Sequence, residues 1–190
     1  MLMNACSSKD KEMILPYLDD IELDAPCAPE DLKRYAHKMI GDRGLMVYLI
    51  WKLLEKEHPE IDAKGLLAKA CHQFGILKAN AMGECRTADE WMKKSGARWG
   101  LLAFDQKITE LNEEKAVKIF GCCPHMDAAR RVGATEEEIS SLCKDIMLYA
   151  DWGTISPYEH LELTFPAPTC AEGGNCEMTV KLKKKSCCSK

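Results

Sequence analysis

The chain has 190 residues, a net charge of −4, 46% hydrophobic residues and 29% charged residues. This length suits one domain, and the composition is typical of soluble globular proteins. The negative charge argues against general binding to nucleic acid, which requires a basic face. The longest apolar run, from Leu45 to Leu54, contains Lys52 and is too short to span a bilayer, so no membrane contact is expected.

Cysteine usage points to a reducing compartment. There are 11 cysteines, and the segment from Met1 to Cys6 lacks the charged region and the long apolar stretch of a secretory signal. We therefore expect a cytoplasmic protein whose thiols stay reduced. The odd count also disfavours a complete disulfide framework. Most of these cysteines would then be core residues, and a few would bind metal or perform chemistry.

The first half of the chain predicts helices. Residues 1–28 are expected to be irregular, with Pro16 and Pro26 as breakers, and residues 29–104 to be helical. Gly41-Asp42-Arg43-Gly44 is expected to interrupt the helical pattern, since glycine is unfavourable inside a helix. The predicted helices cover residues 29–40, 45–56 and 62–82, and a fourth begins near Thr87 and contains Trp91, Trp99 and Leu102.

In the second half, residues 105–182, the spacing of apolar residues changes from the helical period to the alternation of strands. Residues 107–111 and 116–122 predict a hairpin, and a short helix follows Pro124. Thr135 and Glu138 have the spacing of a capping box, which begins a further helix. The apolar stripe of that helix is Ile139, Leu142, Cys143, Ile146 and Met147, and Asp151-Trp152-Gly153 is expected to end it.

A second hairpin is predicted at the end of the domain. A tight turn at Gly173-Gly174 would pair Phe165 with Leu182 and place the larger apolar residues on one face. Pro166 and Pro168 cannot donate to a strand ladder, so the first strand is expected at an edge or to be bulged. The same register pairs Ala167 with Val180, Thr169 with Met178 and Ala171 with Cys176.

These elements predict an α+β fold. An N-terminal helical array would pack on a small antiparallel sheet made of two β-hairpins with intervening helices. Residues 29–182 would form a single domain, and residues 183–190 a disordered tail rich in lysine and cysteine.

The stretch from Phe120 to Asp127 contains the first candidate for chemistry. Proline is favoured at the first helical position, so Pro124 places Cys123 at the helix N-cap. Backbone N–H groups and the helix dipole stabilise an anion there, and a thiol in that place should ionise more easily. His125 could add positive charge or act as a base. Alternatively, Cys123 ends a strand and packs as a small apolar residue.

Two further cysteines have predicted positions on inward faces. Cys143 belongs to an apolar helical stripe, and Cys176 shares a strand face with Met178. Together with Cys123 they could meet in one interior, where three thiols would suit zinc or a pocket with one nucleophilic thiol. The spacings are not those of a zinc finger or ribbon. The pair Cys187-Cys188 in the tail could capture a thiophilic metal, or belong to an unstructured terminus.

Three short motifs resemble one known family. They are Cys123-Pro124, Cys143-Lys144-Asp145 and the stretch from Gly173 to Met178. Over about residues 105–182 the chain resembles the L-2-amino-thiazoline-4-carboxylic acid hydrolase family and, more distantly, the four-vinyl reductase domains that bind small ligands. The family pattern leads us to expect Gly-Asp and two residues before the last cysteine, whereas Asn175 alone separates Gly174 from Cys176. Cys122 and the Cys187-Cys188 tail are further departures from that pattern.

The resemblance implies hydrolytic opening of a small sulfur-containing heterocycle without a required cofactor. Such a reaction needs a nucleophile or activated water, an acid for the leaving group and a group that binds the substrate carboxylate. The candidate catalytic residues are Cys123 as nucleophile or ligand contact, His125 as base, Cys143 lining the pocket, and Asp145. The candidate substrate-binding residues are Cys176 and, from charge alone, Arg130 or Arg131.

Two other functions remain open. The protein could be a non-catalytic sensor whose cysteine-lined pocket binds a small ligand or a thiophilic metal. It could also be an interaction module with structural cysteines. For the hydrolase and for the sensor, the expected partner is a small molecule. The sequence is also compatible with a homo-oligomer.

Overall fold

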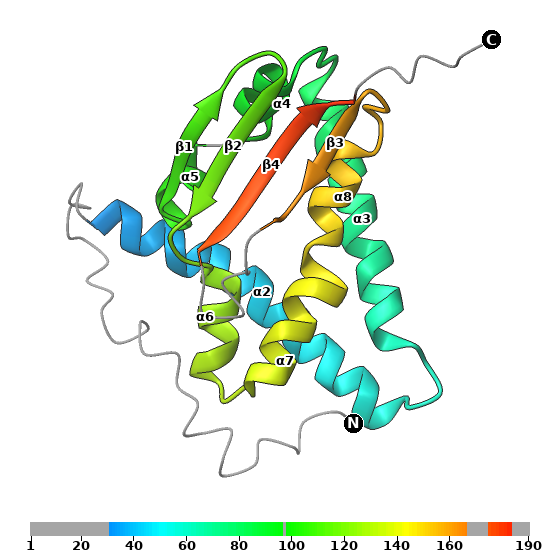
Figure 1. The fold of residues 1–190 in the computed structure, drawn as a ribbon. Helices are drawn as coiled ribbons and strands as arrows, with labels where there is room; N and C mark the ends of the chain where they lie inside the picture. Colours follow the sequence, from blue (N-terminus) through cyan, green and yellow to red (C-terminus); the bar gives the residue numbers. More distant parts are fainter. Residues whose placement is uncertain (1–30, 97, 167–174, 184–190) are drawn as a thin grey trace.

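The computed structural model describes residues 31–96, 98–166 and 175–183, and these residues form an α+β fold (Figure 1). The predicted irregular segment 1–28 and almost all of the predicted tail lie outside them. The helical elements are α2 (Asp31–Glu57), α3 (Ala63–Met82), α4 (Ala88–Ser95), α5 (Arg98–Ala103), α6 (Pro124–Arg131), α7 (Glu136–Ser141), the π-helical η1 (Leu142–Met147) and α8 (Tyr149–Ile155). The strands are β1 (Gln106–Leu111), β2 (Lys115–Phe120), β3 (Leu161–Thr164) and β4 (Cys176–Leu182).

The two predicted hairpins form one antiparallel sheet. Its strand order is β1-β2-β4-β3, so the pairing of β2 with β4 joins the two halves. Helices α4, α5 and α8 contact the sheet and lie on one side of it in Figure 1. Ala116, Met178 and Val180 are buried on that side, whereas Lys107 and Lys181 are exposed on the other. Strand β3 lies at an edge, as the prolines predicted, although it ends before Pro166.

The register predicted for the last two strands is wrong by four residues. Leu161, and not Phe165, pairs with Leu182, and Leu163 pairs with Val180. An even shift keeps the same side chains on the same face, so the apolar pattern could not reveal it. Phe165 lies beyond the strand and packs edge-on against Trp152, with ring centroids 5.6 Å apart. The predicted partners Ala167, Thr169 and Ala171 and the turn Gly173-Gly174 lie outside the described residues.

Helix α2 corrects the predicted break at Gly41–Gly44. It runs without interruption, because both glycines lie where α6 approaches closely. A Cβ atom at Gly44 would lie 2.6 Å from the Cα of His125, and one at Gly41 would lie 3.0 Å from the Pro124 carbonyl oxygen. The local cost of glycine in a helix, about 1 kcal/mol each, is therefore offset by packing between the two helices.

Helix α4 is capped by Thr87 as expected, but it ends at Ser95 instead of continuing through Leu102. Gly96 follows it in an extended conformation, and α5 is a separate helix. Trp91 is buried in the core, as predicted. The break turns the chain toward the start of β1.

The helix begun by the predicted capping box also differs at its far end. The reciprocal bonds of Thr135 and Glu138 are present. The chain then continues through η1 and α8 to Ile155, so the expected end at Asp151–Gly153 is wrong. Gly153 lies at the crossing with α3, where a Cβ atom would be 3.1 Å from the Cα of Gly75. The pattern Asp-Trp-Gly therefore marks a close helix contact and not a helix end.

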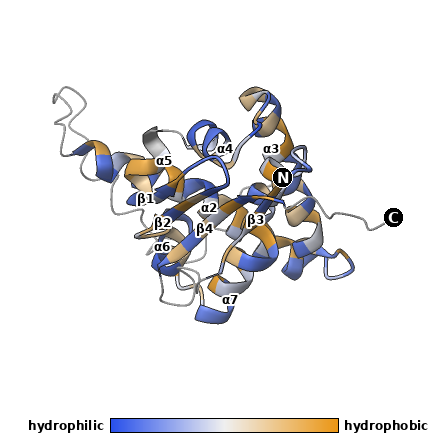
Figure 2. Ribbon diagram, turned by 45° about the horizontal axis from the view of Figure 1, so that its top comes forward, coloured by the Kyte–Doolittle hydropathy of each residue, from blue (hydrophilic) through white to orange (hydrophobic). Residues whose placement is uncertain are grey.

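The buried apolar side chains form two main clusters. One lies among α2, α6, α7 and η1, and the other lies between the sheet and helices α3, α4 and α8. Helix α3 also has exposed apolar residues, Leu66, Phe74 and Leu77, and orange segments mark it in Figure 2. In the part of the chain that the structure describes, no helix is both long and apolar enough to cross a membrane.

Candidate functional site beneath the sheet

A buried lysine lies on the helix-facing side of the sheet. Lys118 is in β2 opposite Met178, and its side chain alternates with those of Val117 and Ile119. The residue is only 5% exposed, and its Nζ atom lies 5.0 Å from the centre of the Phe120 ring. Burial lowers the Lys118 pKa to about 8, because a charged ammonium loses its hydration there. This amine can therefore gain or lose a proton close to neutral pH.

Asp151, on α8, is the acidic partner in the same interior. Burial raises the pKa of its carboxyl group, and the positive charges of Lys118 and Lys78 oppose that rise. As a whole residue Asp151 is half-buried. Within the described residues, neither the Lys118 ammonium nor the Asp151 carboxylate forms a salt bridge or side-chain hydrogen bond. Two opposite charges thus approach each other without touching.

A thiol completes the group. Cys176 begins β4 opposite Phe120 and is 9% exposed. It is close enough to Lys118 for its charge to influence the lysine's pKa. Titratable groups whose surroundings move their pKa values toward neutrality are typical of catalytic sites, although structural ion pairs also show such shifts. We call Lys118, Asp151 and Cys176 the sheet-interior site.

Cys123 occupies the predicted N-cap of α6. Its backbone is extended, with φ −127° and ψ 102°, and Pro124 takes the first helical position. The Cys123 side chain makes no capping hydrogen bond. It is half-buried against the apolar cluster that includes Cys143 and Met126. The local geometry predicted from Pro124 is therefore present, with the thiol directed to helical packing.

His125 does not supply the positive charge that the sequence suggested. Burial and the nearby Arg43 lower its pKa to about 4, so the ring is neutral at pH 7. The Ile40 carbonyl accepts a hydrogen bond from the ring, and the Phe104 ring packs edge-on with centroids 5.5 Å apart. The remaining ring nitrogen, Nδ1, is buried and has no hydrogen-bond partner within the described residues. A base with this pKa is weak at neutral pH.

Cys143 and Asp145 lie on different faces of η1. Cys143 is buried in the helical cluster. The Asp145 carboxylate accepts a hydrogen bond from Ser141, lies 3.8 Å from Lys64 Nζ, and is 55% exposed at its side chain. The two residues are therefore not brought together, even though π-helical turns are frequent at functional sites.

The two candidate arginines lie at the end of α6. The Arg130 guanidinium bonds the Glu136 carboxylate at 3.0 Å and lies 3.5 Å from Asp127. Arg131 is exposed, and its guanidinium lies beside Gly41 of α2. Arg130 thus already has carboxylate partners from its own chain.

The predicted meeting of three cysteines is found only in part. Cys123 and Cys143 share the helical cluster, whereas Cys176 is not part of that cluster and lies beside Lys118. Within residues 31–96, 98–166 and 175–183, no three His, Cys, Asp or Glu side chains are grouped to hold a metal ion. The pair Cys187-Cys188 lies outside those residues.

Sequence reasoning missed both charged members of the sheet-interior site. The signal for Lys118 was its place within Ala116–Phe120, a strand with apolar residues on both sides of the lysine. Such a strand is buried on both faces, so its lysine must be buried too. The signal for Asp151 was its position four residues after Met147, which continues the apolar stripe of the helix.

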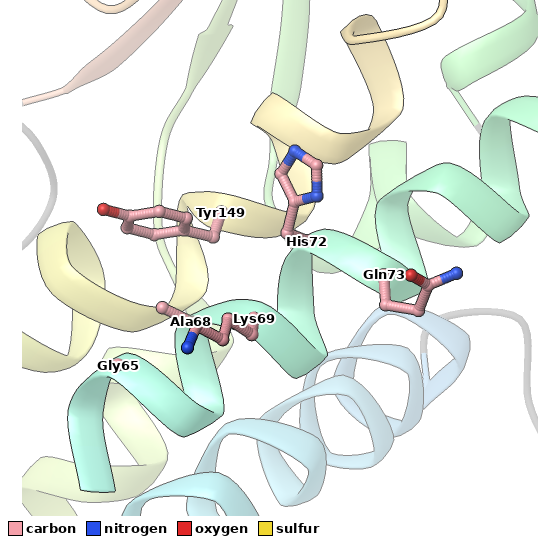
Figure 3. Close-up of a pocket in the computed structure, with 6 residues that line it drawn as sticks. All are labelled: Gly65, Ala68, Lys69, His72, Gln73 and Tyr149. Carbon is pink, nitrogen blue, oxygen red and sulfur yellow. The ribbon is translucent and has the colours of Figure 1, made fainter. Parts of the chain in front are cut away.

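A pocket lies on the helical surface, apart from the sheet-interior site. Figure 3 shows this pocket between α3 and α8, with Lys69, His72, Gln73 and Tyr149 at its walls and Gly65 and Ala68 at its base. It is shallow and open, with a volume of about 460 Å³. None of the residues predicted from the sequence lines it, and it contains no acid. It is therefore the weaker candidate.

No family model matches the chain, and no curated protein or solved structure is significantly similar to it. The function is therefore inferred from the residues of this chain, with the resemblance over about residues 105–182 as an additional expectation.

Proposed function

We propose that the protein is a hydrolase that opens a small, carboxylate-bearing heterocycle between Lys118 and Asp151. The observation that carries this proposal is a buried lysine and a half-buried acid that influence each other's pKa in one interior and, among the described residues, form no salt bridge or side-chain hydrogen bond. Buried charges in proteins are normally paired, because an isolated charge loses its hydration. A ligand with a carboxylate at one end and a protonated nitrogen at the other would supply both missing partners.

Each residue of the sheet-interior site has a role in this reaction. The Lys118 ammonium binds the substrate carboxylate. The Asp151 carboxylate binds the protonated nitrogen, takes up its proton, which the raised pKa of Asp151 favours, and passes that proton to the departing atom. The Cys176 thiol, or a water molecule in its place, attacks the ring carbon between sulfur and nitrogen. In the net reaction one water is consumed, the carbon gains an oxygen, and the broken C–S or C–N bond leaves a thiol or an amine.

The resemblance supports the same substrate class. Cys176 belongs to the stretch from Gly173 to Met178 that resembles the amino-thiazoline carboxylate hydrolases. A 2-amino-thiazoline-4-carboxylate carries both a carboxylate and a basic amidine-like nitrogen. Its two ends therefore match the charges of Lys118 and Asp151.

The test is turnover of L-2-amino-thiazoline-4-carboxylic acid by the full chain, followed by mass spectrometry for a product heavier by one water. We expect Lys118→Met to raise KM, because it removes the carboxylate-binding charge while keeping the chain volume. We expect Asp151→Asn to lower kcat by about 100-fold or more, as is usual for loss of a general acid. Lys181→Met is the matched control, since Lys181 is exposed on the opposite face of the same sheet.

A non-catalytic ligand-binding function is the second candidate. Lys118 and Asp151 alone suffice to hold a zwitterion, whether or not Cys176 reacts. Under this alternative the compound raises the melting temperature of the wild-type chain and of Lys181→Met, and not of Lys118→Met, with no product formed. Absence of both turnover and stabilisation would contradict both functions.

A further inference from the structure

Beside the N-terminus of α6, a cysteine, a histidine and an aspartate form a second constellation. The Cys122 Sγ atom lies 3.8 Å from Nδ1 of His37, which belongs to α2. The other ring nitrogen of His37, Nε2, lies 3.3 Å from a carboxylate oxygen of Asp127 in α6. His37 lies 85 residues before Cys122, whereas Asp127 follows Cys122 closely in α6, and the three share none of the side chains of the sheet-interior site.

Both nitrogens of the His37 ring lie next to polar atoms of other elements. Nδ1 lies 3.0 Å from the backbone carbonyl oxygen of Ala103, which can only accept a hydrogen bond. Nε2 faces the Asp127 carboxylate, which in its charged form also only accepts. Nδ1 is thus within reach of both the Cys122 sulfur and a backbone carbonyl, while Asp127 lies at the opposite side of the ring.

The thiol is fixed in position by hydrogen bonds. The backbone N–H of Cys122 donates to the Phe104 carbonyl at 3.2 Å, and the Cys122 thiol donates to the Ala103 carbonyl oxygen at 3.4 Å. Cys122 is half-buried, and the side chains of His37 and Asp127 are 24% and 38% exposed. Helix α6 begins two residues later, and the first N–H groups of a helix have no intrahelical partner and suit a developing oxyanion.

We propose that Cys122 is a nucleophilic thiol that accepts acyl groups from activated esters or thioesters, with His37 holding its proton and Asp127 orienting the ring. The sulfur supplies the electron pair of a new S–C bond to the acyl carbon. The bond from that carbon to the leaving oxygen or sulfur breaks, and its electron pair stays with the leaving group. The proton held by His37 passes to the leaving group, so the products are an acyl thioester on Cys122 and an alcohol or thiol.

This inference does not depend on the proposed hydrolase function. It uses Cys122, which is one of the departures from the resembling family, and it leaves Lys118, Asp151 and Cys176 untouched. Its logic is that of a nucleophile, a base and an orienting acid within contact distance of each other.

The experiment is acetylation of the full chain by p-nitrophenyl acetate. Release of p-nitrophenol measures the rate, and acid quenching followed by peptide mass spectrometry locates the thioester among the 11 cysteines. We expect a rapid phase of one equivalent per chain located at Cys122. Cys122→Ser should abolish that phase. Cys123→Ser, which changes the adjacent thiol, is the matched control and should leave the rate within about twofold, because it keeps the contacts of His37 with Cys122 and Asp127.

The variants His37→Gln and Asp127→Asn separate reactivity from folding. His37→Gln should slow the rapid phase by about 100-fold or more, in the range for loss of a proton-transfer group. Asp127→Asn should slow it by about tenfold at an unchanged melting temperature, because the ring remains but its orienting charge is lost. A thioester located first at another cysteine, or an Asp127→Asn chain that folds and reacts at the wild-type rate, would overturn the proposal.

Discussion

The chemistry of His125 is determined by its neighbours rather than by its residue type. The sequence places this histidine next to an N-cap cysteine, which suggests a base or a cation. In the structure it lies against Gly44 of α2 and the Phe104 ring, and burial lowers its pKa to about 4. It therefore acts as a packing residue with one hydrogen bond to the Ile40 carbonyl.

This burial predicts a pH dependence of stability. The folded chain keeps His125 neutral down to about pH 4, whereas the unfolded chain takes up a proton near pH 6.5. The contribution of His125 is therefore fully present above pH 6.5 and is lost as the pH falls toward 4. The free energy of unfolding should fall by up to about 3 kcal/mol from this group alone.

Urea unfolding at pH 7 and at pH 4 measures this loss. His125→Gln cannot titrate, so its stability should fall less between the two pH values than that of the wild-type chain. Equal losses in the two proteins would show that another group causes the acid sensitivity.

Single residues show what the sequence could and could not reveal about the candidate sites. The predicted strand of residues 116–122 ends earlier, at Phe120, so strand alternation does not apply to Cys122 and Cys123. It could not show which of the two meets His37, because that contact joins residues 85 positions apart. Lys118 was missed for a different reason: a lysine normally lies in water, and only its strand environment shows otherwise.

The contact between α2 and α6 depends on the close packing of His125 against Gly44. We expect Gly44→Ala to lower the free energy of unfolding by about 2–3 kcal/mol or more, because the new methyl group would overlap His125. Gly100→Ala in α5 is the matched control, since a Cβ atom there meets nothing within 4 Å. That substitution should be neutral or stabilising by up to about 1 kcal/mol.

Chemical denaturation of both alanine variants tests this contact. Destabilisation of Gly44→Ala by less than about 0.5 kcal/mol would mean that α6 can shift away from α2 at little cost.

The start of α7 is tied to α2 through Glu138. Its carboxylate accepts the backbone N–H of Thr135, the hydroxyl of Tyr48 at 3.0 Å and the ammonium of Lys52 at 2.9 Å. The Lys52 ammonium is the largest of the influences that lower the Glu138 pKa to about 2. This stabilisation is present above pH 4.5 and is lost as the pH falls through about 2.

We expect Glu138→Gln to cost about 1–2 kcal/mol of unfolding free energy at pH 7, since it removes a charged partner of both the cap and α2. Glu137→Gln removes an equal charge from the exposed neighbouring position and should cost less than about 0.5 kcal/mol. Thermal unfolding of the two variants side by side makes the comparison. Similar costs would indicate a general effect of charge near the helix N-terminus.

Elements were predictable where their signals are local. Asp62, Thr87 and Thr135 each cap a helix at the predicted place, because a cap depends on residues within one turn. The glycines of α2 and the register of β3 against β4 were not predictable in this way. Both depend on a partner that is distant in the sequence, and the local pattern is compatible with two arrangements.

At the scale of the whole molecule, the α+β class followed from the change in period near residue 105, which the structure confirms at the start of β1. The sheet-interior site could not follow from it. Lys118 is on a strand and Asp151 on a helix, so their approach depends on how α8 lies against the sheet.

The end of the chain allows a prediction at this scale. The last backbone hydrogen bond found in the described part is donated by Lys183 to the His160 carbonyl, at 2.8 Å. Deleting Ser186–Lys190 should therefore leave the melting temperature within about 2 °C of the wild-type value, a change typical of well under 1 kcal/mol. Circular dichroism on heating tests this, and a larger loss would place the tail within the stabilising structure.

The central place of β4 has a consequence for synthesis. The strand is last in the sequence but second from one edge in the sheet, between β2 and β3. While the chain emerges from the ribosome, β2 and β3 must wait with unpaired edges until Cys176–Leu182 has been made. A truncated messenger RNA, or a ribosome that stalls near residue 170, would therefore release a product in which β2 and β3 have unpaired edges. Such a product would have a strong tendency to aggregate.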